Sequence, residues 1–159
     1  SKIWVISDTH LRSGQNLPAS FTSKVNREDV IIHLGDFISL DVVQYLESLA
    51  GLEAVSGNCD SHAIKDIFPS RKIIDLDGLR IGLIHGRGAP SATLDTVRKE
   101  FEGKVDIALF GHTHDPYHGR FGGTVFFNPG SLIEGRGNGR SYGLLCHEGA
   151  EVWGEIFKI

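Results

Sequence analysis

The chain has 159 residues, of which 40% are hydrophobic and 23% are charged, and this balance is typical of a soluble globular domain. We therefore expect one domain over residues 1–159, because a chain of this length holds one core of ordinary size. The formal net charge of −4 argues against polymeric nucleic acid or an anionic membrane as a partner. No apolar run approaches the length that spans a membrane.

Cysteine usage and the first residues bear on the compartment. The only two cysteines, Cys59 and Cys146, favour a reducing compartment over a disulfide framework. Residues 1–4 lead directly into the first expected strand, so we expect no signal peptide. Together these features predict a cytoplasmic protein.

Short apolar runs rich in β-branched residues open the chain. Residues 3–6 and 30–32 predict buried parallel strands, because the runs are too short for typical helices. Ser39 is placed to cap a helix that ends near Gly51. The stripe that this helix should turn towards a sheet consists of Val42, Val43, Leu46 and Leu49.

The rest of the chain combines one more helix with hairpins. Residues 91–101 predict a helix with an inward stripe of Leu94, Val97 and Phe101, which should pack beside a strand over residues 105–110. Three pairs of residues separate strand-like runs and are typical of hairpins: Asp77-Gly78, Gly122-Gly123 and Glu148-Gly149. The predicted fold class is α/β, as a layered α/β/β/α sandwich with two mixed sheets.

Five polar motifs each follow an apolar run. They are Asp8-Thr9-His10, Gly35-Asp36, Gly57-Asn58-Cys59-Asp60, His85-Gly86 and Gly111-His112-Thr113-His114. Taken singly, such motifs are often turns or helix caps. The crevice outside the carboxyl ends of the strands is where open α/β sheets build their sites, so motifs far apart in sequence should meet there. Their order and context indicate one shared centre.

The candidate ligands of this centre are two carboxylates, four imidazoles and one carboxamide. They are Asp8, His10, Asp36, Asn58, His85, His112 and His114. This mixed nitrogen and oxygen set suits Mn, Fe, Zn, Co or Ni better than Mg or Ca, which prefer oxygen ligands. Seven ligands exceed what one tetrahedral site uses and fit two metal positions that share a carboxylate, for which Asp36 is the natural bridge.

The motif order resembles that of calcineurin-like metallophosphoesterases, and in particular the small bacterial and archaeal phosphodiesterase branch that keeps only the core domain. The likeness spans nearly the whole chain and includes Asn128-Pro129-Gly130-Ser131. It implies the metallophosphoesterase fold. The first metal would then be held by Asp8, His10, Asp36 and His114. The second would be held by Asp36, Asn58, His85 and His112.

This resemblance implies a metal-dependent phosphodiesterase in which a hydroxide that bridges two divalent metals attacks a small phosphodiester. Mn is the first choice of metal, with Ni, Fe, Zn or Co as alternatives. The expected catalytic residues are Asp36, Asn58, Cys59 and Asp60. Two other functions stay open: a phosphomonoesterase, or a non-catalytic metal-binding scaffold like the retromer subunit that the chain also resembles. A homodimer or higher homo-oligomer is expected.

One position departs from the larger family. Many relatives have a histidine where Cys59 stands, thought to protonate the leaving group while the following acid, here Asp60, orients it. The thiol could donate a proton, ionise beside the metals or sit as a small buried group, and Asp60 could instead cap a loop. Arg136, in a glycine-rich stretch, is a candidate phosphate contact or part of a solvated loop. Core or surface roles are expected for the remaining histidines, His33, His62, His118 and His147.

Overall fold

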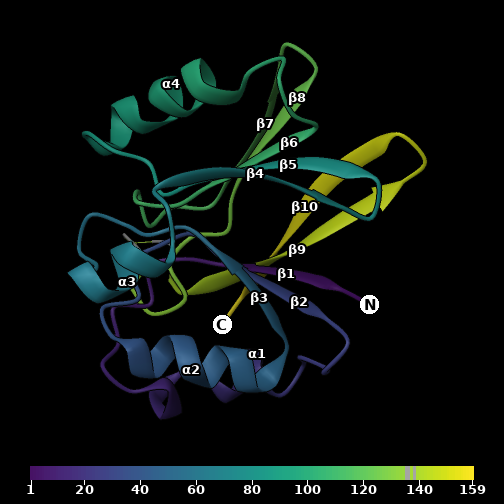
Figure 1. The fold of residues 1–159 in the computed structure, drawn as a ribbon. Coiled ribbons are helices and arrows are strands. Elements are labelled where there is room, and N and C mark those ends of the chain that lie inside the picture. The colour runs from purple at the N-terminus through teal and green to yellow at the C-terminus, as the bar shows by residue number, and fades with distance from the viewer. Residues whose placement is uncertain (135–136, 138) are drawn as a thin grey trace.

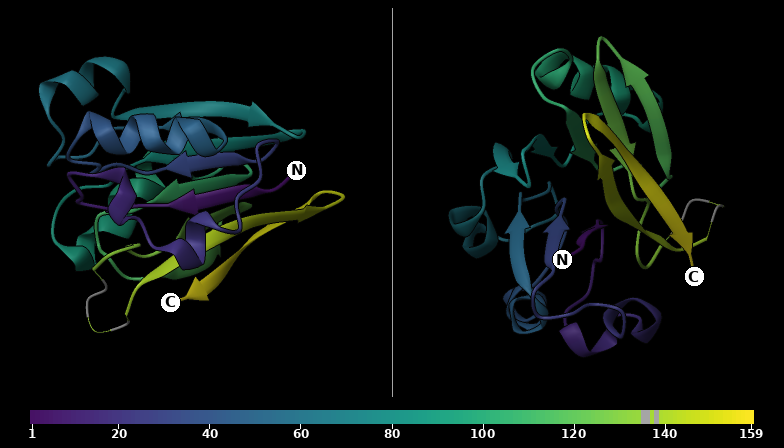
Figure 2. Two further views of the ribbon diagram at one scale, coloured as in Figure 1. Left: turned by 90° about the horizontal axis from the view of Figure 1, so that it is seen from below. Right: turned by 90° about the vertical axis from the view of Figure 1, so that its right-hand side faces the viewer.

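Two five-stranded sheets, packed face to face, form the centre of the fold in the computed structural model (Figure 1). The structure describes residues 1–134, 137 and 139–159. Arg136, the candidate phosphate contact, lies outside the described residues. The helices cover the outer faces of the two sheets, so the layers follow the predicted α/β/β/α order (Figure 2).

The first sheet has the strand order β10-β9-β1-β2-β3. Its strands are β1 (Ile3–Ile6), β2 (Val30–His33), β3 (Gly51–Ala54), β9 (Ser141–Glu148) and β10 (Glu151–Lys158). Strands β1 and β2 are parallel, as their apolar runs predict, and β3 runs parallel to β2. Strand β9 runs antiparallel to β1 and forms a hairpin with β10. The sheet is therefore mixed.

The second sheet has the order β4-β5-β6-β8-β7. Its strands are β4 (Arg71–Leu76), β5 (Leu79–Ile84), β6 (Ile107–Phe110), β7 (Tyr117–Phe121) and β8 (Thr124–Asn128). Strands β5, β6 and β8 are parallel, and the hairpins at 77–78 and 122–123 add β4 and β7 as antiparallel edges. The predicted hairpins and the mixed character of both sheets are confirmed.

Five helical segments surround the sheets in the part of the chain that the structure describes. They are the 3₁₀ turn η1 (Gly14–Asn16) and the helices α1 (Ala19–Thr22), α2 (Leu40–Leu49), α3 (His62–Ile67) and α4 (Pro90–Phe101). Helices α1, α2 and α3 bury side chains against the first sheet, and α4 buries Val97 and Phe101 against the second. Both predicted helices are thus present. None of the helices in the described ranges is long and apolar enough to cross a membrane.

The central strands β1 and β6 are buried and apolar on both faces, because each sheet is covered on both sides there. In β1, Ile3 and Val5 face the second sheet, whereas Trp4 and Ile6 face the helices. Strand β6 alternates in the same way between the core between the sheets and the core beneath α4. This double burial explains why the sequence shows continuous apolar runs rather than the alternation of a half-exposed strand.

Ser39 occupies the residue before α2, as predicted, but the prediction that its side chain caps the helix is wrong. The hydroxyl makes no cap hydrogen bond and instead donates to the carbonyl of Arg12 at 2.7 Å. The bond ties the start of α2 to the loop that follows β1. Because the competing acceptor comes from 27 residues away, local sequence could not reveal it.

Candidate metal centre

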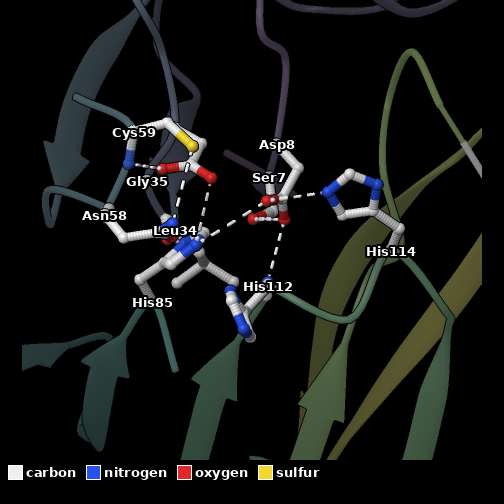
Figure 3. A network of polar contacts seen from close by, with 12 residues as sticks. Ser7, Asp8, Leu34, Gly35, Asn58, Cys59, His85, His112 and His114 are labelled. Carbon is white, nitrogen blue, oxygen red and sulfur yellow. Dashed lines mark hydrogen bonds and ion pairs between the residues drawn. The ribbon is translucent and has the colours of Figure 1, made fainter. Parts of the chain in front are cut away.

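The five motifs meet at one rim of the molecule, beyond the carboxyl ends of the parallel strands. Asp8 and Asp36 follow β1 and β2, and Asn58 follows β3. His85 follows β5 directly, and His112 and His114 follow β6. The first sheet thus supplies the carboxylates and the second most of the imidazoles, and Figure 3 shows Asp8 between the rings of His85 and His114.

Asp8 is fully buried and uses its two carboxylate oxygens differently. Oδ2 accepts hydrogen bonds from the Ser7 hydroxyl at 2.6 Å and from the backbone N–H of His112 at 3.0 Å. Oδ1 has no hydrogen-bond partner among the described residues. Instead it faces the Nε2 atoms of His114 at 3.3 Å, His10 at 3.6 Å and His85 at 3.8 Å.

Asp36 divides its carboxylate in the same way. Oδ1 accepts a hydrogen bond from the backbone N–H of Cys59 at 2.9 Å. Oδ2 lies 3.3 Å from Nε2 of His85 and 3.5 Å from Nε2 of His10. Each carboxylate therefore has one oxygen held by the protein and one oxygen that faces imidazole nitrogens.

These atoms fit a metal ion. Asp8 Oδ1, His10 Nε2 and His85 Nε2 are buried without a hydrogen-bond partner in the described part of the chain, although such atoms are normally satisfied. Two ligands that each lie about 2.0–2.2 Å from one ion are at most about 4.4 Å apart, and the separations of 3.3–3.8 Å meet this limit.

Three overlapping groups of side chains have their ligand atoms within 4.8 Å of one another. They are Asp8 with His10 and His114, Asp8 with Asp36 and His85, and Asp36 with His10 and Cys59. Because the three groups share members, they form one continuous cluster that is larger than the ligand set of a single metal ion. Among the described residues, five of the seven predicted ligands thus come together, and Cys59 joins them.

The other two predicted ligands lie beside this cluster. Asn58 is exposed, and its amide nitrogen lies 3.5 Å from the Cys59 sulfur. The His112 ring lies 5.2 Å from the His85 ring, measured between centroids. Its Nε2 donates to the Gly88 carbonyl at 2.8 Å, which leaves Nδ1 available as a ligand atom.

His85 is oriented from behind by the chain of the first sheet. Its Nδ1 donates to the carbonyl of Leu34 at 2.8 Å, because a carbonyl oxygen can only accept. This bond turns Nε2 towards Asp8 and Asp36. A ligand histidine that donates its other nitrogen to a carbonyl is the usual arrangement in metal sites, since the bond fixes both tautomer and ring orientation.

The backbone is strained at several of the predicted metal ligands. Asp8, His10 and Asp36 have φ values of 54°, 48° and 63°, in the left-handed region that non-glycine residues rarely adopt. His112 and His114 have φ values of 73° and 65°. Five of the seven predicted ligands therefore hold an unfavourable conformation, and such strain persists where the surrounding structure fixes side chains for a task.

Electrostatics couple the carboxylates to the histidines. Burial raises the pKa of both Asp8 and Asp36, but nearby histidines outweigh it and hold each carboxyl pKa below its ordinary value. For His85, burial opposes the charged form, yet Asp36 and Asp8 raise its pKa to about 8. The carboxylates also raise the pKa of His10, so without metal the protons on His10 and His85 compensate buried negative charge.

Asp60 fastens the loop after β2 to the loop after β3. Its Oδ2 accepts from the backbone N–H groups of Asp36 at 2.9 Å and Gly57 at 2.8 Å, and its Oδ1 accepts from Ile38 at 2.9 Å. Gly57 has no room for a side chain, because a Cβ there would lie 2.7 Å from the Asp36 nitrogen. The contacts of Asp60 are those of a loop cap, and they position Asp36.

Of the alternatives for Cys59, the small buried group is wrong, because the side chain is exposed. Partial desolvation by neighbouring groups nevertheless raises the pKa of the thiol, and so does negative charge on Asp36. The group therefore stays protonated at neutral pH in the metal-free protein. His33 is fully buried in the core, as expected, and burial lowers its pKa to about 3. The side chains of His62, His118 and His147 lie on the surface.

Sequence reasoning missed several polar residues that support the centre. The Ser7 hydroxyl holds Asp8, and the Ser131 hydroxyl donates to the Asp8 carbonyl at 2.8 Å. The Asn128 amide donates to the Gly111 carbonyl at 3.2 Å. The Asn128-to-Ser131 segment carried a resemblance but no assigned role. Ser7 gave no signal beyond its place next to Asp8.

Asp60→Asn should weaken the link between the two loops. Asparagine keeps one acceptor oxygen but replaces the other with an NH₂ group, which cannot accept a hydrogen bond from a backbone N–H. We therefore expect the free energy of unfolding to fall by about 1–3 kcal/mol. Urea unfolding of the metal-free protein measures the change. Asp66→Asn, on the exposed side of α3, is the control and should change stability by less than about 0.5 kcal/mol. Equal stabilities of the two variants would show that Asp60 does not hold the loops.

Comparisons with known proteins agree with this geometry. Residues 2–149 match the family described as calcineurin-like phosphoesterase superfamily domain. A probable metallophosphoesterase of Methanothermobacter thermautotrophicus is 32% identical over 158 residues, which cover 98% of this chain and 91% of the relative. A phosphodiesterase of Methanocaldococcus jannaschii is 29% identical, over 81% of this chain and 82% of the relative.

Among solved structures, a Vps29 variant from Entamoeba histolytica is similar with a TM-score of 0.74, covering 100% of this chain and 99% of the other. At 24% sequence identity, this likeness concerns the fold. It confirms the expected metallophosphoesterase fold with two mixed sheets. The match over nearly the whole length, together with the ordered motifs at one rim, establishes that the chain belongs to the calcineurin-like phosphoesterase superfamily.

Proposed function

We propose that this protein is a divalent-metal-dependent phosphodiesterase that acts on small phosphodiesters through two metal positions. The observation that carries the proposal is the unpartnered Oδ1 of Asp8, which faces the Nε2 atoms of three histidines. A buried carboxylate oxygen in such surroundings fits a shared cation better than any contact within the chain. The likeness to a phosphodiesterase of M. jannaschii supports diesters as substrates.

In this proposal the first metal is held by Asp8, His10, Asp36 and His114, and the second by Asp36, Asn58, His85 and His112. Mn is the first choice, with Ni, Fe, Zn or Co as alternatives, because these ions accept mixed nitrogen and oxygen ligands. When bound, two such ions lower the pKa of a shared water and polarise the phosphoryl oxygens. The orientation of His85 and the free Nδ1 of His112 support the second position.

The chain's own residues make the site attractive to phosphate esters. Asp8 and Asp36 bring only two negative charges against two divalent ions, so the loaded site stays cationic. Their other oxygens are already held by Ser7 and by backbone N–H groups, which keeps the carboxylates from rotating away. Asp60 acts as a positioning residue for Asp36 rather than as a group that touches the ester.

Cys59 lies at the edge of the centre beside His10 and Asp36, at the position where many relatives have a histidine thought to protonate the leaving group. A thiol with a raised pKa is a weak acid and a poor proton donor compared with an imidazolium. We therefore propose that the protein prefers esters whose leaving groups need little protonation. The two free cysteines support a reducing, cytoplasmic setting as part of the same proposal.

Asp36→Asn should abolish diester turnover. Asparagine removes the negative charge that two metals would share, so we expect kcat/KM on bis-p-nitrophenyl phosphate to fall more than about hundredfold. This loss exceeds the one expected for a residue that only hydrogen-bonds a metal ligand, which is about 10–100-fold. The assay uses metal-stripped protein refilled with Mn²⁺. Asp75→Asn, exposed on β4, is the matched control and should keep full activity.

The same assay with p-nitrophenyl phosphate separates the competing functions. Faster turnover of this monoester than of the diester would identify a phosphomonoesterase. Tight Mn²⁺ binding without turnover of either ester would instead favour a protein-interaction scaffold. The retained metal-ligand residues argue against that role.

Metal binding should strengthen with pH. The pKa of His85 in the metal-free folded protein is raised to about 8, so the ring is cationic below that pH and a metal must displace its proton. We expect the apparent affinity for Mn²⁺ to rise up to about tenfold per pH unit below pH 8 and to level off above it. Calorimetric titrations at several pH values measure this slope. A slope that His85→Gln leaves unchanged would assign the proton to another group.

Cys59→His should raise turnover on esters with poor leaving groups. An imidazole at this exposed position can donate a proton near neutral pH, and such general acid catalysis is worth about 10²–10⁴-fold. The measurement compares kcat for methyl p-nitrophenyl phosphate with kcat for a dialkyl phosphate of the same charge. Equal kcat on the dialkyl ester before and after the substitution would show that leaving-group protonation does not limit this enzyme.

A further inference from the structure

A cavity of about 600 Å³ opens beside the candidate metal centre. Its wall includes Asn58 and His85, so it is continuous with the proposed second metal position. From there it extends between α3, which contributes Lys65, and α4, which contributes Thr96 and Glu100. The volume lies within the range of sites for small molecules, so one arm of a bound ester has room in it.

The charges in this wall oppose the charge of the whole protein. The chain has a net charge of −4, yet the wall contains three cationic side chains and one acidic side chain. The cations are Lys65, Arg71 and Arg87, and the acid is Glu100. A cationic cavity on an acidic protein concentrates anions at that place.

Only one of the three cations is neutralised by the wall itself. Arg71 pairs with Glu100 at 3.0 Å, and its guanidinium lies over the Phe101 ring, 4.7 Å from the centroid. The side chains of Lys65 and Arg87 form no hydrogen bond or ion pair with residues in the described ranges. These two positive charges are therefore available to a ligand.

Two apolar side chains also line the cavity. Phe68 and Ile84 line it and are both partly exposed. The Phe68 ring stacks on Phe37 at 5.7 Å between centroids, with an angle of 12° between the planes. This stack holds the Phe68 ring in place, and a fixed aromatic surface suits a flat ring of a ligand.

We infer that this cavity binds the arm of a phosphodiester that carries a flat ring and a second phosphate group, which Lys65 and Arg87 contact. The inference rests on the proposed function and names the substrate class: a nucleoside-like diester with an additional phosphate. Arginine and lysine are the usual partners of phosphate. The acidic side chain among the residues that line the cavity is Glu100, and it already pairs with Arg71.

The test compares two esters with the same leaving group. One is thymidine 5′-(p-nitrophenyl phosphate), and the other carries an additional 3′-phosphate. With Mn²⁺-loaded protein we expect kcat/KM to be roughly tenfold higher for the ester with the second phosphate, because charge-assisted hydrogen bonds add to its binding. Equal or lower kcat/KM for that ester would overturn the inference.

Variants assign the preference to the two cations. In Lys65→Gln combined with Arg87→Gln, the preference for the ester with the second phosphate should disappear, because both contacts to that phosphate are lost. Lys104→Gln combined with Arg120→Gln removes the same charge from exposed positions outside the cavity and should keep the preference. A preference that survives in the first pair, or that is lost equally in both, would contradict a specific contact.

Equilibrium binding separates this inference from the proposed function. Calorimetry with thymidine 3′,5′-bisphosphate and thymidine 5′-phosphate needs no turnover. Tighter binding of the bisphosphate, lost in the Lys65→Gln and Arg87→Gln double variant, supports the inferred role of the cavity. Absence of hydrolysis of both esters would count against the proposed phosphodiesterase activity but not against this binding site. Equal binding of the two nucleotides would overturn the cavity's role whatever the hydrolysis assay gives.

Discussion

Two buried carboxylates, Asp8 and Asp36, impose the constraint on which the rest of the centre depends. Ionised groups out of water need opposite charge and hydrogen bonds close by, or they take up protons. Here each carboxylate places one oxygen on backbone or hydroxyl donors and turns the other towards imidazoles. In the metal-free protein, Asp8 and Asp36 raise the pKa of His10 and His85, so these two rings hold protons more strongly than usual. The same geometry offers lone pairs to a cation once those protons leave.

The fold meets this constraint with strained backbone conformations in the loops that follow the strands. Parallel strands in both sheets deliver their following loops to one rim, and the residues there turn sharply back with positive φ. That strain persists because the loops are cross-linked by contacts such as those of Asp60, and because the strands behind them are buried on both faces. A rigid double-layered core thus makes an unfavourable local geometry stable.

Charge is distributed unevenly over the molecule in a way that matches phosphate chemistry. The surface as a whole is acidic, which disfavours long polyanions, while the centre and its neighbouring cavity gather cationic or cation-binding groups. In the proposed function, a small anionic ester binds at this cationic place rather than on the acidic exterior. The cavity also lies where α3 and α4 approach from different sheets, so its shape depends on how the layers pack.

The sequence alone determined the fold class, the two long helices, the hairpins and most of the candidate ligands. It could do so because strand runs, turn dipeptides and ordered motifs are local signals. Tertiary structure decided the bond of Ser39, the exposure of Cys59, the support from Ser7, and the meeting of Lys65 with Arg87 in one cavity. Each of these features depends on packing between elements of the fold. Residue type and spacing in the sequence do not indicate which backbone group or cavity a side chain will contact.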